Sequence, residues 1–138
     1  MTLRRALGID LGDRRVGIAM ATGNVATPLQ VVSRSKSTAL DHEQIFAIAT
    51  EWEVDVLVVG VPYSLDGSVG PAAEKVLAEI DQLRARTNLP VEIYDERFTT
   101  VTAQQRLREG GVSNRQSKNL VDAMAATVLL QAWLDNHQ

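Results

Sequence analysis

Residues 6–20 read ALGIDLGDRRVGIAM. Two apolar runs flank a short turn that is rich in glycine and charge, which is the pattern of a β-hairpin. Asp10 stands at the end of the first run, inside or just at the end of a strand that should be buried. A buried charge is costly unless it is paired or binds a metal, so Asp10 is the first candidate functional residue.

The composition is typical of one globular domain, which we expect to span residues 1–138. Apolar residues make up 45% of the chain and charged residues 22%, enough to build a core without metal or disulfide support. Cysteine is absent, which excludes disulfides, zinc–cysteine sites and thiol nucleophiles. No apolar run approaches the ~20 residues of a membrane span, and residues 1–5 leave no room for a signal peptide. These features predict a cytoplasmic protein.

The net charge of −3 is unevenly distributed along the chain. Residues 1–40 carry six lysines and arginines against two acids, residues 41–96 carry three against twelve, and residues 97–118 carry five against one. A local basic surface can bind phosphate groups even on an acidic protein. The two basic segments therefore favour a nucleic-acid partner, and chance variation of a solvated surface is the alternative.

The apolar periodicity predicts an α/β fold. Strands are expected over residues 4–10, 15–22, about 26–33, 54–61 and 91–96, and helices over residues 39–52, 71–87, 99–109 and 117–136. Three antiparallel strands followed by alternating helices and strands predict a mixed five-stranded sheet with helices on both faces. Pro28 favours an edge position for the third strand. Trp52 and Trp133 are expected in the core, and His42 on an exposed helix face.

Two more acids occur in surroundings similar to those of Asp10. Glu96 ends the last predicted strand, and Asp122 lies in the final helix, where Ala125 and Ala126 share its face. Small residues let a helix approach a sheet closely, which would bring the Asp122 carboxylate against the strand ends. We therefore expect the three carboxylates to converge.

Converging carboxylates, without thiols or a usable histidine pattern, indicate a site for a hard divalent cation. Oxygen ligands suit Mg²⁺ or Mn²⁺, and repulsion among close acids favours such an ion. The site could hold two ions roughly 4 Å apart, one activating water and the other stabilising the leaving oxygen in phosphodiester cleavage. The backbone phosphates on either side of the scissile bond would then be held by Arg14, Arg15, Arg97, Arg115 and Lys118.

Each acid also has a purely structural interpretation. Asp10 could cap the hairpin turn, and residues 95–97 could form an ion pair at a solvated strand end. Asp122 could pair with Lys118, four residues earlier on the same helix. These alternatives stay open for each acid taken by itself.

Four motifs, in order along nearly the whole chain, resemble the YqgF (RuvX) family. The motifs are Asp10-x-Gly12-x-x-Arg15-x-Gly17-x-Ala19, Gly60-x-Pro62-x-x-x-Asp66-Gly67, Asp95-Glu96-Arg97-x-Thr99-Thr100 and Asp122-Ala-x-Ala-Ala126. One motif alone would be weak evidence for the family, whereas four motifs in this order are highly specific.

The resemblance implies an RNase H-like fold, related to the RuvC Holliday-junction resolvases, and a metal-dependent nuclease. It implies 5′-end processing of pre-16S rRNA in ribosome biogenesis as the first expectation, with resolution of Holliday junctions as the alternative. The expected partners are pre-rRNA or branched DNA and ribosomal precursor particles. A monomer and a homodimer are both compatible with the sequence.

The resemblance also implies roles for particular residues. Asp10, Glu96 and Asp122 would be the catalytic acids and metal ligands, and Glu96 is preferred to Asp95 by analogy with related nucleases. The substrate-binding residues beside the acids would be Arg97, Thr99 and Thr100, with the segment around Arg115 guiding the substrate.

Two other classes of protein fit part of the sequence. A non-catalytic nucleic-acid-binding module would share the fold but lack an intact set of acids, and all three acids are present here. The Asp-x-Gly turn also resembles the phosphate loop of actin-like ATPases, but those proteins need a second similar domain that 138 residues cannot supply.

Overall fold

The fold is described from a computed structural model, in which residues 4–98 and 114–136 are described, with the backbone alone for residues 98 and 114–122. The strands are β1 (Arg5–Leu11), β2 (Arg15–Thr22), β3 (Val25–Ser33), β4 (Val56–Val61) and β5 (Val91–Asp95). The helices are α1 (Thr38–Glu51), α2 (Pro71–Arg86) and α4 (Asn114–Asn136), and a 3-10 turn, η1 (Glu96–Phe98), follows β5. The helix predicted over residues 99–109 lies outside the described residues.

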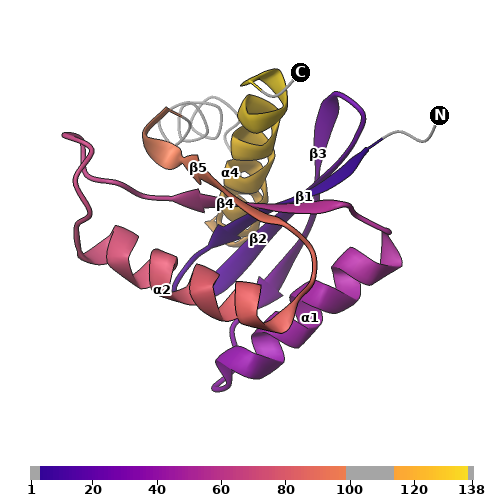
Figure 1. The fold of residues 1–138 in the computed structure, drawn as a ribbon, viewed down its shortest axis with the longest axis horizontal. Helices are drawn as coiled ribbons and strands as arrows, with labels where there is room; N and C mark the ends of the chain where they lie inside the picture. Colours follow the sequence, from indigo (N-terminus) through magenta and orange to yellow (C-terminus); the bar gives the residue numbers. More distant parts are fainter. Residues whose placement is uncertain (1–3, 99–113, 137–138) are drawn as a thin grey trace.

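The strands form one mixed sheet in the order β3-β2-β1-β4-β5. Strand β2 is antiparallel to both β1 and β3, whereas β1 and β4, and β4 and β5, are parallel pairs. Helices α1 and α2 cover one face of the sheet and α4 covers the other (Figure 1). The predicted α/β architecture, with a five-stranded mixed sheet between helices, is confirmed.

Local sequence signals account for the ends of several elements. The side chain of Ser37 accepts a hydrogen bond from the Leu40 amide at the start of α1, and Pro71 begins α2. Pro28 lies on edge strand β3, as expected, and the register of the β2–β3 pair shifts beside it, between Ile18 and Ala19. The hairpin region therefore follows its sequence pattern closely.

The two faces of the sheet have cores of different composition. The α1 and α2 face is filled by large side chains, including Leu7, Ile9 and Leu11 of β1. The α4 face is rich in alanine, and α4 approaches it so closely that a Cβ on Gly8 would lie 2.8 Å from Leu130 Cβ. Because side chains alternate along a strand, Asp10 lies on the same face as Gly8, the α4 face.

Two expectations about burial are wrong. His42 is fully buried rather than exposed, because polar partners from α2 surround it. Trp52 is not a core residue: it caps the carboxyl end of α1 and keeps 36% of its surface exposed. Trp133, in contrast, is buried in the α4 core as predicted.

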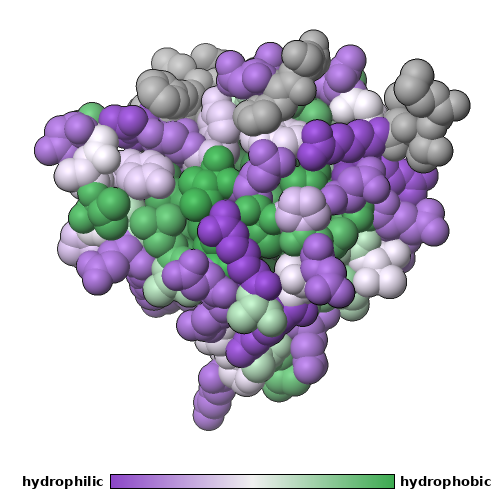
Figure 2. Space-filling view, viewed as in Figure 1, coloured by the Kyte–Doolittle hydropathy of each residue, from purple (hydrophilic) through white to green (hydrophobic). Residues whose placement is uncertain are grey.

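The surface of one face shows how the apolar residues are distributed. In Figure 2, hydrophobic residues gather at the centre of this face, and hydrophilic residues surround them. No described helix is both long enough and apolar enough to span a bilayer.

Candidate active site

Two of the predicted acids meet at one edge of the sheet. Asp10 is the penultimate residue of β1, and Glu96 follows directly after β5. Strands β1, β4 and β5 run parallel to one another, so their carboxyl ends share this edge. The topology therefore brings together two residues that are 86 positions apart in the sequence.

The two side chains interact strongly. Burial raises the pKa of Glu96 to about 8, and the neighbouring Asp10 contributes through its negative charge and through a hydrogen bond. Asp95 raises the pKa further, to a smaller extent. Two carboxylates this close are stable only if they share a proton or a cation. The geometry is therefore that of a cation-binding or acid–base pair.

Gly60 makes room for this pair from the strand between them. It lies in β4, and a Cβ at this position would be 2.5 Å from Glu96 Oε1 and 2.7 Å from Glu96 Cγ. Only glycine leaves that space open. Gly60 belongs to one of the family motifs, but no local pattern indicates its spatial role, because its contact is with Glu96, which follows another strand.

Asp95 points into a different set of contacts. It accepts from the Arg97 side chain, with Nε 2.8 Å and a terminal nitrogen 2.6 Å from Oδ2, and from the Arg97 amide. Burial alone would raise the pKa of Asp95, but these bonds lower it. Asp95 thus binds the Arg97 guanidinium, while Glu96 is the acid that contacts Asp10.

Arg97 also links the acid-bearing segment to the loop after β4. Its guanidinium donates to the Leu65 carbonyl at 3.3 Å and lies 3.2 Å from the position of a Cβ on Gly67. A role in substrate binding remains a prediction for Arg97, which in this structure already binds groups of the protein.

Helix α4 packs on the face of the sheet that carries Asp10 and contacts β1 there. Arg4 lies over the Trp133 ring, 5.1 Å from its centroid, and Gly8 faces the backbone of Ala126. The side chains of Asp122, Arg115 and Lys118 lie outside the described residues, as do Thr99 and Thr100.

The turn after Asp10 carries the remaining predicted phosphate ligands. Arg14 is exposed and Arg15 is partly buried. The turn is tight, because a Cβ on Gly12 would lie 2.5 Å from the Arg15 carbonyl oxygen. The two arginines therefore follow Asp10 closely along the chain.

Comparison with known proteins places the chain in a family. A family model described as "RuvX: Holliday junction resolvase" matches residues 4–136. The chain belongs to the RuvX family. The sequence-based recognition is thus confirmed over nearly the full length.

Relatives that align over nearly the whole chain carry a nuclease name. A protein of Anaeromyxobacter sp. (strain Fw109-5), named "Putative pre-16S rRNA nuclease", is 46% identical over 133 residues, which are 95% of this chain and 96% of the relative. A protein of the same name from Crocosphaera subtropica is 42% identical, covering 96% and 94% of the two chains. These similarities support nuclease activity as the enzyme class of this chain.

The fold of this RuvX chain is similar to that of solved RuvC proteins. Thermus thermophilus RuvC in complex with a Holliday junction substrate aligns with a TM-score of 0.59 at 18% identity, covering 97% of this chain and 95% of RuvC. A second T. thermophilus RuvC structure gives a TM-score of 0.54 at 15% identity, with 96% and 95% covered. The likeness confirms the RNase H-like fold.

The acid pair of this RuvX protein fits a divalent cation. Within residues 4–98 and the described side chains of α4, no three acids or histidines form a metal-binding group. The described pair nevertheless offers carboxylate oxygens, the donors that Mg²⁺ and Mn²⁺ prefer. Burial first, and then the negative charge of Asp10, raises the pKa of Glu96, and a cation bound between the two acids would offset that charge.

Proposed function

We propose that this RuvX protein is a metal-dependent endonuclease that hydrolyses phosphodiester bonds of structured nucleic acid. The observation that carries the proposal is the contact between Asp10 and Glu96, with Gly60 leaving the space they share. Burial and repulsion of this degree are typical of functional acids rather than of structural ones.

Asp10, Glu96 and Asp122 would hold Mg²⁺ or Mn²⁺, with two ions as the expected number. Bound there, the metal would supply activated water and stabilise the leaving oxygen. The preference for Glu96 over Asp95 is supported by their contacts, because Asp95 binds Arg97 whereas Glu96 contacts Asp10. The close packing of α4 on the sheet face that carries Asp10, with Ala126 against Gly8, supports Asp122 as the third acid.

The other predicted residues would bind and orient the substrate. Arg14 and Arg15 project from the turn that follows Asp10, where they would hold phosphates of the bound strand. Arg115 and Lys118 at the start of α4, with Thr99 and Thr100, would complete the basic surface. Each arginine would position the scissile phosphate by charge and hydrogen bonds, without itself transferring a proton.

The substrate proposed first is pre-16S rRNA, cleaved during 5′-end processing in ribosome biogenesis. The support is the name shared by relatives that are 42–46% identical over almost the full chain. A four-way DNA junction is the second candidate, favoured by the description of the family model. In both cases the substrate is a structured nucleic acid in the cytoplasm, acted on by a monomer or a homodimer.

The test compares the wild type with Asp10→Asn on a pre-16S rRNA fragment and on a four-way junction, in Mg²⁺ or Mn²⁺. We expect Asp10→Asn to lose cleavage by roughly 100-fold or more, the scale on which one strong electrostatic contact to a transition state acts. Asp81→Asn, an exposed acid on α2, is the matched control and should cleave like the wild type.

Three outcomes would contradict parts of the proposal. Equal cleavage by the wild type and Asp10→Asn would remove Asp10 from the mechanism. Cleavage of the junction alone would replace the RNA by branched DNA as substrate. Binding that persists in EDTA, without cleavage of either substrate, would indicate a non-catalytic binding module.

A further inference from the structure

We propose that Arg34 is a positioning residue for the candidate active site. From the side of the sheet opposite to the acid pair, it holds the turn of residues 11–15 that follows Asp10. The inference rests on the proposed function, because it concerns the placement of Asp10 and of the arginines in the same turn.

Arg34 binds the turn at two points. Its backbone amide donates to the Arg14 carbonyl at 2.9 Å, and its side-chain Nε donates to the Gly12 carbonyl at 3.0 Å. The amide of Gly12 in turn donates to the carbonyl of Asp10 at 3.1 Å. One residue thus fixes both sides of the turn, within two residues of the acid.

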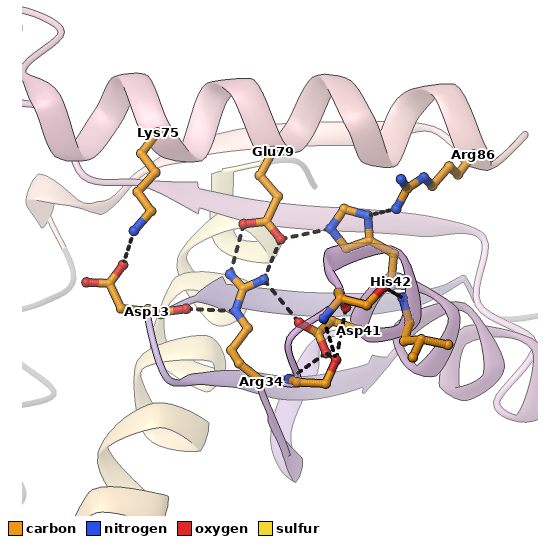
Figure 3. Close-up of polar contacts among 11 residues, drawn as sticks. Asp13, Arg34, Asp41, His42, Lys75, Glu79 and Arg86 are labelled. Carbon is orange, nitrogen blue, oxygen red and sulfur yellow. Dashed lines mark hydrogen bonds and ion pairs between the residues drawn. The ribbon is translucent and has the colours of Figure 1, made fainter.

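The rest of the Arg34 guanidinium is held in a fixed orientation (Figure 3). Its two terminal nitrogens donate to the two carboxylate oxygens of Glu79, on α2, at 2.6 and 2.8 Å, and one of them lies 3.9 Å from Asp41, on α1. A planar guanidinium bound by two parallel bonds has little freedom to rotate. The direction of Nε towards Gly12 is therefore set by Glu79.

Glu79 is itself fixed by a buried network. It accepts from His42 Nε2 at 2.8 Å, and the Nδ1 atom of His42 accepts from Arg86 at 2.9 Å. His42 is 0% exposed, and the side chains of Arg34 and Glu79 are only 16% and 13% exposed. Water screens such contacts weakly, so the network is a stiff connection between α1, α2 and the turn.

A second ion pair, between the turn and α2, is more exposed than that of Arg34. Lys75 pairs with Asp13 at 2.6 Å, but both side chains are mostly exposed, and surface pairs of this kind contribute little. Gly12 makes the turn tight without anchoring it. The pairing of β1 with β2 would survive removal of the Arg34 side chain, but the turn would lose its buried connection to α2, and a misplacement of about 1 Å can cost up to 100-fold in rate.

The test is Arg34→Lys, which keeps one positive charge but cannot bind Gly12 and both Glu79 oxygens at once. At a temperature well below the melting point, we expect kcat to fall by about tenfold with a smaller change in KM. Hydrogen exchange of the amide at position 34, which donates to Arg14, should become faster. This second measurement reports the turn directly and needs neither substrate nor metal.

Two control variants separate positioning from general stability. Arg86→Gln removes a bond at the far end of the same network, and Ile80→Val weakens the core under α2. Both should keep the wild-type kcat and the wild-type exchange of the position 34 amide, even where they lower Tm as much as Arg34→Lys does.

Glu79→Gln is measured in parallel, so that the inference can be tested even if Arg34→Lys does not fold. It leaves Arg34 in place but weakens the bidentate contact between residues 34 and 79. We expect it to lower kcat by a smaller factor than Arg34→Lys does. A folded variant of Arg34 or Glu79 with unchanged kcat and unchanged amide exchange would overturn the inference. Failure of the proposed nuclease is recognised separately: either the wild type would cleave neither substrate or Asp10→Asn would cleave as well as the wild type, and the exchange of the position 34 amide would still report the turn.

Discussion

Neighbouring acids on one strand end acquire opposite properties from their surroundings. The contacts with Arg97 lower the pKa of Asp95 although burial opposes this, whereas burial and Asp10 raise the pKa of Glu96 to about 8. The sequence Asp95-Glu96 contains no local signal for this difference. It arises from the direction in which each side chain leaves the end of β5 and from what lies there.

The raised pKa of Glu96 predicts a pH-dependent cost in stability. Between about pH 4.5 and pH 8 the folded protein keeps a proton at Glu96 that the unfolded chain has lost, so stability falls as pH rises through this range. Glu96→Gln removes the cost. Without added metal at pH 8, we expect its Tm to exceed that of the wild type by roughly a few degrees, while its nuclease activity is lost.

Thermal unfolding from pH 5 to 9 checks this prediction. Glu92→Gln, on the same strand, is the control and should follow the wild-type curve. Addition of Mn²⁺ at pH 8 should raise the Tm of the wild type more than that of Glu96→Gln. If Tm depends on pH in the same way for Glu96→Gln and the wild type from pH 5 to 9, ionisation of Glu96 does not destabilise the fold, and the prediction is wrong.

The space at Gly60 gives a second prediction at the same scale. Gly60→Ala places a Cβ 2.5 Å from Glu96 Oε1, so Glu96 must move away from Asp10. We expect cleavage to fall by about tenfold or more while the protein remains folded, since the three nearest atoms all belong to the side chain of Glu96 and none to the backbone. Steady-state cleavage rates and circular dichroism test this, and a fully active Gly60→Ala protein would contradict the site geometry.

At the scale of the elements, local sequence patterns were sufficient for most of the fold. The continuous apolar run of residues 54–61 predicted the central strand β4, whose six residues are all buried. Pro71 marked the start of α2, and Pro28 marked an edge strand. These signals act within one element, so the chain shows them without its tertiary contacts.

The features that the sequence did not reveal depend on distant residues. His42 looked like an exposed histidine because its partner Glu79 lies 37 residues away on another helix. Trp52 looked like a core residue from its size, but it follows the end of α1 and faces solvent. The candidate acids stand out by their local surroundings, at strand ends and on a helix face with small residues, but no local periodicity connects them, and the family pattern supports joining them.

The packing of α4 on β1 predicts the effect of a single methyl group. In Gly8→Ala the new Cβ would lie 2.8 Å from Leu130 Cβ and 2.9 Å from the Ala126 carbonyl oxygen, so α4 must move away from the sheet. We expect a loss of about 1–3 kcal/mol in the free energy of unfolding. Cleavage should also decrease, because Asp122 is carried by the same helix.

Val76→Ala is the matched control for that variant. It removes volume from the core under α2, on the opposite face of the sheet, and should lower stability without lowering cleavage by the folded protein. Denaturant unfolding and cleavage assays at low temperature distinguish the two. Equal activity of both variants would show that the distance between α4 and the sheet does not matter for the reaction.

At the scale of the whole molecule, the two faces of the sheet respond to pH in opposite ways. On the α4 side, Glu96 makes the fold less stable as pH rises. On the α1 and α2 side, burial would raise the pKa of Glu79, but hydrogen bonds from Arg34 and His42 lower it, and bonds from Ser35 likewise lower the pKa of Asp41 against its burial. Stability should therefore decline towards both ends of the pH range.

The loss of stability at low pH is expected to come from the buried network around Glu79. A carboxylate with a lowered pKa stabilises the fold above its unfolded value and loses this contribution as pH falls through its folded value. For Glu79 the loss begins below about pH 4.5, its ordinary value. Glu79→Gln should cost roughly 1–3 kcal/mol at pH 7, the worth of hydrogen bonds to a charged group, and should make stability less dependent on pH below that point.

Urea unfolding at several pH values from 3 to 7 measures both effects. Glu74→Gln, an exposed acid in the first turn of α2, is the control and should keep the wild-type slope. The difference in unfolding free energy between the wild type and Glu79→Gln should shrink steadily as pH falls, because protonation of Glu79 removes the same charge that the substitution removes. A difference that stays constant down to pH 3 would mean that the network stabilises the fold by packing, and that the charge of Glu79 contributes nothing measurable.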